Sequence, residues 1–200
     1  MSIKSIRTGW TGISALAGND QWFSDFESIA SVTVGAGGQA TVTFSSIPDT
    51  YQHLQLRYIA REESGGGTNA ANQSVIRFNS DSGNSYSLHR LFGNGSTASS
   101  DGYASSAPIS SIRVSGLTGS GSTTNCFAGA IVDILDYANT NKNTTVRSLA
   151  GGDLNDTNGF IFFNSGAWYN TAAITSITIT NLSAVDFNQH SHFALYGIRG

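Results

Sequence analysis

The longest apolar run in the sequence, residues 126–137 (CFAGAIVDILDY), constrains the fold more than any other feature. At a period of two residues, apolar side chains fall on both of its faces: Cys126, Ala128, Ala130, Val132 and Ile134 on one, Phe127, Ile131, Leu135 and Tyr137 on the other. The β-branched residues and Gly129 in mid-run favour a strand over a helix. A strand that is apolar on both faces is predicted to lie inside a sheet, with both faces covered.

An Asn-rich polar segment, residues 138–144, follows this run and leads into a second strand-like stretch, residues 145–149 (TVRSL). A strand, a polar turn and another strand in direct succession predict one long hairpin. We expect this hairpin to form the core of a β-sandwich.

The rest of the chain from residue 29 shows strand patterns at short, even spacing, with about eleven candidates and no helical stripe. Long loops at uneven intervals favour a single jelly-roll-like antiparallel β-sandwich over residues 30–200. Within it, residues 29–34 and 40–44 are predicted to form a hairpin across the Gly-rich turn 35–38. Residues 93–107 are expected to be a long Gly/Ser loop with a functional role, and Asn164, Ser165 and Gly166 a turn.

Residues 1–29 differ from the remainder, because they show neither a sustained period of two nor a helical stripe. This irregular N-terminal arm carries four aromatic residues among Gly, Ser and Asp: Trp10, Trp22, Phe23 and Phe26. One interpretation is an ordered arm that lies across its own domain. The other is an attachment arm that docks on another subunit, because aromatic anchors are enriched in protein interfaces.

Composition limits the partners. Charged residues make up 12% of the chain, about half of the usual share, and the net charge of −3 gives no footprint for nucleic acid or an anionic membrane. The hydrophobic fraction of 39% indicates a packed domain.

Cys126, the only cysteine, is expected to be a buried filler residue. With no recognisable signal peptide or membrane span in the sequence, we expect synthesis in a cytoplasm.

Few residues offer catalytic chemistry. His190 and His192 form a His-Ser-His step that can be weighed as a metal clip. Two carboxylate pairs, Glu62 with Glu63 and Asp153 with Asp156, can be weighed as glycosidase acids or as solvated loop carboxylates, and the solvated interpretation is favoured. The chain has no nucleophile elbow, zinc-protease motif, EF-hand loop or P-loop. We therefore expect a protein that is not an enzyme, with no catalytic residues, no cofactor and no metal.

Arginines occur inside several strand patterns, namely Arg57, Arg77, Arg113 and Arg147. They fit the solvated face of a sheet, or else some of them pair with Asp133 or Asp136, whose carboxylates lie within an apolar run. Trp168 and Tyr169, beside Asn164 and Asn170, likewise have two interpretations. They are either a core aromatic pair or an aromatic-plus-amide surface that holds a sugar.

Four segments, residues 47–61, 130–151, 168–179 and 191–200, resemble a group of virion structural proteins of tailed bacteriophages, cyanophages among them. The resemblance covers most of residues 40–200 but not the N-terminal arm. It implies a virion component, made in the host cytoplasm, whose partners are other virion proteins such as the major capsid protein or tail and fibre proteins. It carries no catalytic residues.

The sequence therefore predicts a non-enzymatic bacteriophage virion protein that decorates or cements the capsid through its N-terminal arm. A homo-oligomer is expected, with a trimer favoured, and no nucleic-acid or membrane partner. The alternative is a tail-fibre or receptor-binding module, in which Trp168 and Tyr169 contact host surface glycans.

Overall fold

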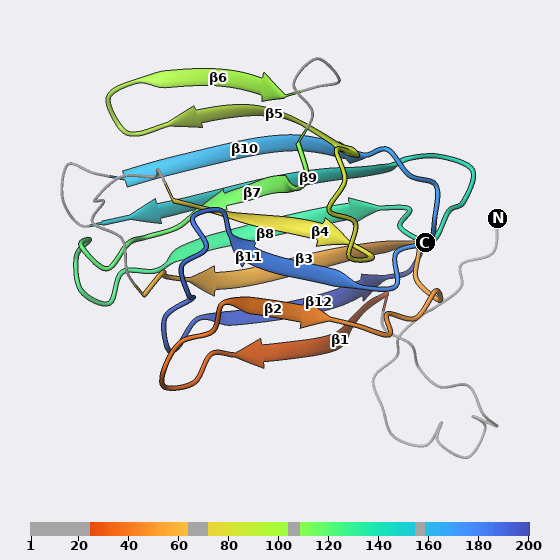
Figure 1. Cartoon of the computed structure of the whole chain (residues 1–200), viewed down its shortest axis with the longest axis horizontal. Helices are drawn as coiled ribbons and strands as arrows, with labels where there is room; N and C mark the ends of the chain where they lie inside the picture. Colours follow the sequence, from red (N-terminus) through yellow and green to blue (C-terminus); the bar gives the residue numbers. More distant parts are fainter. Residues whose placement is uncertain (1–24, 64–71, 104–108, 155–158) are drawn as a thin grey trace, which may run out of the picture.

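The computed structural model describes residues 25–63, 72–103, 109–154 and 159–200, which form an all-β sandwich of two antiparallel sheets (Figure 1). The strands in these ranges are β1 (Phe26–Thr33), β2 (Thr41–Phe44), β3 (His53–Ala60), β4 (Gln73–Phe78), β5 (Tyr86–Gly93), β6 (Ala98–Tyr103), β7 (Ile112–Gly116), β8 (Ala128–Leu135), β9 (Thr144–Asp153), β10 (Gly159–Trp168), β11 (Ile177–Asn181) and β12 (His192–Ile198). Among the described residues there is no helix, so none of the length and hydropathy needed to cross a membrane.

The strand order is that of a jelly roll with a wide extension on one sheet. The larger sheet has the order β1-β12-β3-β8-β9-β10-β5-β6, and the smaller has the order β2-β11-β4-β7. The chain crosses repeatedly between the layers, and β1, β12, β3 and β8 form with β2, β11, β4 and β7 the two layers of a jelly-roll unit. The last strand of the smaller sheet, β7, also packs against β9 and β10. Strands β9, β10, β5 and β6 continue the larger sheet beyond this unit (Figure 1). The predicted jelly-roll-like sandwich is confirmed.

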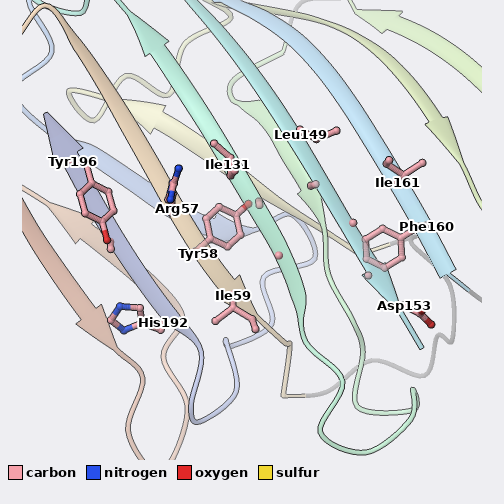
Figure 2. A pocket seen from close by; sticks show the side chains of 16 residues that line it. Arg57, Tyr58, Ile59, Ile131, Leu149, Asp153, Phe160, Ile161, His192 and Tyr196 are labelled. Carbon is pink, nitrogen blue, oxygen red and sulfur yellow. The ribbon is translucent and has the colours of Figure 1, made fainter. Parts of the chain in front are cut away.

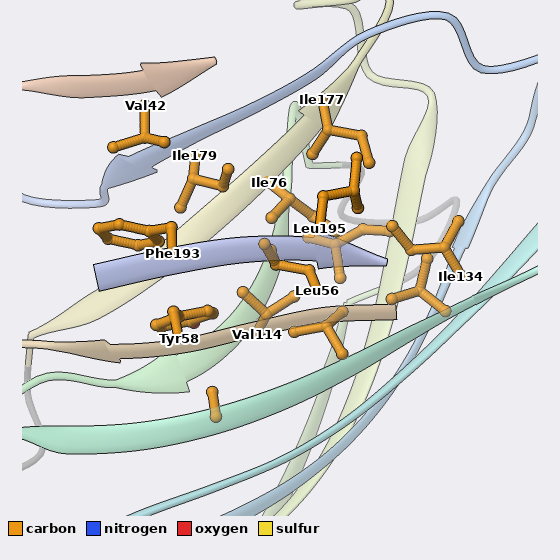
Figure 3. Packing of buried hydrophobic residues seen from close by; sticks show 14 of the residues in the cluster. Val42, Leu56, Tyr58, Ile76, Val114, Ile134, Ile177, Ile179, Phe193 and Leu195 are labelled. Atoms are coloured by element: carbon orange, nitrogen blue, oxygen red, sulfur yellow. The ribbon is translucent and has the colours of Figure 1, made fainter. Parts of the chain in front are cut away.

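The core lies between the two sheets and is built from alternate residues of each strand. In Figure 3, Leu56, Tyr58, Phe193 and Leu195 of the larger sheet pack toward apolar residues of the smaller one, among them Val42, Ile76, Ile177 and Ile179. These side chains are almost completely buried. Since a fully buried side chain of this size stabilises a fold by about 1.5–3 kcal/mol, this layer holds the sandwich together.

The central hairpin is confirmed. Strand β8 pairs with β9 in the middle of the larger sheet, and Ile131 lies opposite Leu149. The expectation that both faces of the 126–137 run are covered is wrong for the described part of the chain. Val132 and Ile134 point into the core, whereas the alternate residue Ile131 is 39% exposed on the opposite face. The smaller sheet packs on one side of the larger sheet only.

The predicted hairpin between residues 29–34 and 40–44 is wrong. Strand β1 pairs with β12 in the larger sheet, and β2 pairs with β11 in the smaller one. Val34 is buried and exchanges backbone hydrogen bonds with Ser191 and His190. Gly37 and Gly38 then adopt positive φ angles, which residues with a Cβ avoid, and the chain crosses between the layers.

Two segments that the sequence predicts as loop and turn are strands. Part of the 93–107 segment forms β6, which pairs with β5 at the edge of the larger sheet. Asn164, Ser165 and Gly166 lie within the continuous strand β10, between β9 and β5. Backbone pairing to neighbours on one or both sides overrides the turn preference of these residues. Strand β1 begins at Phe26, so the folded domain starts ahead of the expected boundary at residue 30.

Candidate protein interface

The outer face of the larger sheet, which points away from the smaller sheet, carries a band of exposed apolar side chains. Each of them is between 39% and 58% exposed. We call these residues the apolar band: Ile59, Leu91, Ile131, Leu149, Ile161 and Phe163. They come from β3, β5, β8, β9 and β10, which are five neighbouring strands, so the exposed apolar surface is contiguous.

The register of the sheet aligns four of these side chains in one row. Ile131 lies opposite Leu149, Leu149 opposite Phe163, and Phe163 opposite Leu91. Cross-strand neighbours on one face have Cβ atoms about 4.5–5.5 Å apart, so the four side chains pack against each other. They form a ridge that runs across the strands.

A hollow lies beside this ridge, where the next row of the sheet contains glycines. Gly129 of β8 lies opposite Gly151 of β9, and Gly151 lies opposite Ile161 of β10. A Cβ placed on Gly129 would have no atom within 4 Å. The hollow is shallow, has a volume of about 760 Å³ and is lined mainly by apolar atoms, with Ile59, Ile131, Leu149 and Ile161 around it (Figure 2).

Charged residues border the apolar band on both sides and balance each other. On one side the Gln55 amide donates a 2.8 Å hydrogen bond to Asp133, and the Arg57 Nε donates one of 2.7 Å to Gln55. Arg147 lies 3.7 Å from Asp133 and remains half exposed. On the other side, Asp153 ends β9. An apolar centre with a charged rim is the usual composition of a protein interface.

The structure places one of the four predicted arm residues, Phe26, on this outer face. Its ring stacks on Tyr196 with centroids 4.7 Å apart, and the Arg57 guanidinium lies 5.5 Å from the ring centroid. The carbonyl of Asp25 accepts a 2.9 Å hydrogen bond from the Arg199 N–H, which ties the start of β1 to the end of β12. Trp10, Trp22 and Phe23 lie outside the described residues.

Trp168 does not form part of a sugar-binding surface. The indole is 1% exposed, stacks on Tyr86 in the core and donates a 2.8 Å hydrogen bond to Asp81, which lowers the pKa of that carboxyl. Of the two interpretations of the Trp168–Tyr169 pair, the core one is right for Trp168. Tyr169 is 59% exposed, and its hydroxyl accepts a 3.3 Å hydrogen bond from Ser87. Adjacent strand residues point to opposite faces, which separates the two rings.

The buried charges at residues 61 and 62 have structural partners. The Arg61 guanidinium donates hydrogen bonds of 2.8–3.1 Å to four backbone carbonyls, those of Ser120, Ser122, Thr123 and Cys126. The Glu62 carboxylate accepts hydrogen bonds from the amides of Asn72 and Asn181, while burial raises its pKa. Sequence reasoning weighed Glu62 as a catalytic acid and as a solvated carboxylate, and missed this buried structural role. An Arg-Glu dipeptide at the end of an apolar strand was the available signal.

The His-Ser-His step lies at the start of β12. His190 occupies a turn with a positive φ, and the His192 Nδ1 is 2.8 Å from the Thr33 hydroxyl. In the described ranges, no three His, Cys, Asp or Glu side chains gather in a group that suits a metal ion. Cys126 is partly exposed, contrary to the buried position expected for it.

Sequence reasoning also missed the apolar band as a site, although the signal was present in residues 126–137. The alternation that buries Val132 and Ile134 leaves Ile131 on the other face. Comparisons of the chain with family models, with curated proteins and with solved structures found no match.

Proposed function

We propose that this protein is a non-enzymatic structural subunit of a tailed-bacteriophage virion, where it decorates or cements the capsid. In this proposal the N-terminal arm attaches the subunit to the shell, and the outer face of the larger sheet packs on a neighbouring protein subunit. The observation that carries the proposal is the exposed apolar band on an otherwise complete sandwich.

The size of the apolar band supports an interface. Its six large side chains lie on neighbouring strands, each between 39% and 58% exposed, beside a hollow of about 760 Å³. Soluble monomers seldom expose contiguous apolar surface of this kind unless it binds a partner. Covering this surface with a partner would stabilise the complex by about 25 cal/mol for each Å² of apolar surface removed from water.

The location of the segments that resemble phage virion proteins supports the same surface. Residues 47–61 contain β3, residues 130–151 contain most of β8 and β9, and residues 191–200 contain β12. These four strands are consecutive neighbours in the larger sheet, in the order β12-β3-β8-β9. Three of the four segments therefore fall on the half of the sheet that borders the hollow and carries Phe26 at its rim, while residues 168–179 lead from the end of β10 into β11.

The proposal is tested by the copy number of this protein in purified particles, measured by quantitative mass analysis against the major capsid protein. A decorating subunit should approach about one copy per capsid subunit, because it follows the symmetry of the shell. A ratio of roughly one in a hundred would contradict decoration and move the protein to the tail or a fibre.

The role of the arm is tested with a full-length variant in which Trp10, Trp22 and Phe23 are replaced by Ala. Purified variant and wild type are added to particles that lack the protein, and the bound fraction is measured after sedimentation. We expect the variant to lose binding, because aromatic anchors carry most of an interface's energy. Binding equal to that of the wild type would show that the arm does not attach the subunit.

A further inference from the structure

We infer that the outer face of the larger sheet binds a second copy of this chain, face to face, about a two-fold axis that crosses β9 between Leu149 and Gly151. The inference rests on the proposed function in one respect, the use of this face as an interface. It goes further by naming the occupant and the register.

The outer residues of β9 are complementary to the same strand running in the opposite direction. Arg147, Leu149, Gly151 and Asp153 follow one another at a spacing of two and all point to the outer face. A two-fold axis in the plane of contact, perpendicular to the strand, reverses this order in the second copy. Leu149 then lies over the second copy's Gly151, and Arg147 lies over its Asp153.

Two other strands, β8 and β5, also place a large side chain and a glycine two residues apart on the outer face. Ile131 and Gly129 of β8 lie in the same rows as Leu149 and Gly151 of β9, and Leu91 and Gly93 of β5 continue these rows beyond β10. The two-fold axis therefore sets three of the four ridge residues, Ile131, Leu149 and Leu91, against a glycine of the other copy, whereas Phe163 of β10 lies over Ile161. Between them, β10 presents large side chains in both rows.

The open space at Gly129 fits this arrangement. A Cβ on Gly129 would have no neighbour within 4 Å, and the hollow around Gly129 and Gly151 has a volume of about 760 Å³. Ile131 and Leu149 stand at its border (Figure 2). A ridge that inserts into this hollow on the second copy fills it with methyl groups, as the contact between two packed sheets requires.

The charges on the outer face are self-complementary in the same register. Arg147 is half exposed, and its contact with Asp133 is 3.7 Å long, so its guanidinium faces solvent. Asp153 is exposed at the other end of β9. The two-fold axis pairs these opposite charges twice, once on each side of the apolar band. Rim charges of this kind set register and orientation more than affinity.

The area of the face suffices for a stable dimer. Eight strands at about 4.8 Å spacing and eight residues at about 3.3 Å rise give a surface of about 34 by 26 Å. Its area is comparable to the roughly 800 Å² that each partner buries in an interface of standard size. Two sheets packed face to face lie about 10 Å apart, with strand directions within about 30°.

The first experiment measures the mass of the full-length protein by analytical ultracentrifugation over a range of concentrations. We expect an even-numbered assembly, a dimer or a hexamer of two trimers, and Leu149→Asp should reduce it to half. The control is Leu182→Asp, since Leu182 is similarly exposed but lies after β11. We expect the dissociation constant to rise at least about 100-fold for Leu149→Asp and to stay unchanged for the control. Equal masses for wild type and Leu149→Asp would overturn the inference.

The second experiment tests the register with charge reversals. Arg147→Asp and Asp153→Arg should each strongly weaken association in this register, because like charges then face each other across the axis. An equimolar mixture of the two variants should associate again, since every pair in the mixed dimer is opposite in charge. Far-UV circular dichroism and thermal unfolding confirm that each variant is folded. Failure of the mixture to associate, with both variants folded, would exclude this register.

The two proposals fail in different ways. A wild-type monomer that is nevertheless abundant in particles would overturn the second-copy inference and leave the proposed function intact. A wild-type dimer that is missing from particles would overturn the proposed function and leave the second-copy inference intact.

Discussion

The two faces of the larger sheet are made by the same strands, yet within the described part of the chain only one of them is covered. On β10, Phe160 and Phe162 point inward and are 8% and 3% exposed, whereas Ile161 and Phe163 point outward and are 58% and 52% exposed. Side-chain chemistry is therefore similar on both faces, and burial is not. The inner face stabilises the fold, and the outer face is free to stabilise an assembly.

The difference also concerns charge. Among the buried arginines, Arg61 has four carbonyl partners, and the Arg90 Nε donates a 2.6 Å hydrogen bond to Asp101. On the outer face, Arg147 and Asp133 are 3.7 Å apart and both partly exposed. Buried charges need their partners for folding, while exposed ones contribute little to it. Pairs of matched substitutions on the two faces test this contrast.

The largest difference is expected for the neighbouring residues Phe162 and Phe163. Phe162→Ala should lower the free energy of unfolding by about 3–5 kcal/mol, because it leaves a cavity against Phe92 and Phe160. Phe163→Ala should change it by less than about 1 kcal/mol, because half of the ring is already in water. Urea unfolding at a concentration where both variants are monomeric measures the two values. Equal losses would mean that the outer face is covered within the monomer.

A smaller difference is expected between two arginines. Arg61→Ala should cost roughly 3 kcal/mol, since it removes a charged donor from the carbonyls of residues 120–126. Arg147→Ala should cost less than about 0.5 kcal/mol, as is usual for exposed ion pairs. Thermal unfolding compares both with the wild type. A tolerated Arg61→Ala would show that water satisfies these carbonyls equally well.

The sequence predicted the fold class and the central hairpin because both depend on local patterns. Alternation of apolar residues identified β8 and β9, and the succession of short strands indicated the sandwich. The same alternation did not reveal which face of β8 is covered, since Ile131 and Val132 are chemically alike. Coverage depends on where the smaller sheet packs, and this is set by pairings between distant segments such as β2 with β11.

The errors have the same origin. The Gly-rich link after β1 has the same sequence pattern whether it closes a hairpin or crosses between the layers. Only the pairing of β1 with β12 shows which of the two it does. Strand β6 (ASSDGY) has no apolar alternation and forms because β5 offers it a free edge. Of the candidate site, the sequence predicted Phe26 as an interface residue and grouped it with an arm. It gave no indication that Phe26 would lie beside Tyr196, which is distant in the chain.

Replacing a glycine by alanine should change the free energy of unfolding in opposite directions on the two faces of the sheet. At Gly152, on the inner face, a Cβ would lie 2.8 Å from the Phe160 ring, so Gly152→Ala should cost about 1–2 kcal/mol. At Gly129, on the outer face, a Cβ meets open space, and Gly129→Ala should stabilise the monomer by about 0.5 kcal/mol through reduced backbone entropy of the unfolded chain. Urea unfolding of both variants gives the two signs. A lower free energy of unfolding for Gly129→Ala would indicate that the hollow is already filled.

The smallest difference is expected between two carboxylates and depends on pH. The hydrogen bonds from Arg90 hold the pKa of Asp101 below its ordinary value. Its contribution to stability is therefore fully present above the unfolded-chain pKa of about 3.9 and is lost as the pH falls through the lower folded pKa. Asp101→Asn should cost about 1 kcal/mol at pH 7, because a third of the carboxylate side chain is exposed, and the deficit should vanish in acid.

Asp133→Asn is the matched variant on the outer face. It should cost a few tenths of a kcal/mol or less, because the contact of Asp133 with Arg147 is long and open to solvent. Urea unfolding of both variants between pH 7 and pH 3 separates the two cases. A deficit for Asp133→Asn as large as that for Asp101→Asn would mean that the outer charges stabilise the monomer. Charges on the outer face would then stabilise the fold of the monomer in addition to pairing two copies.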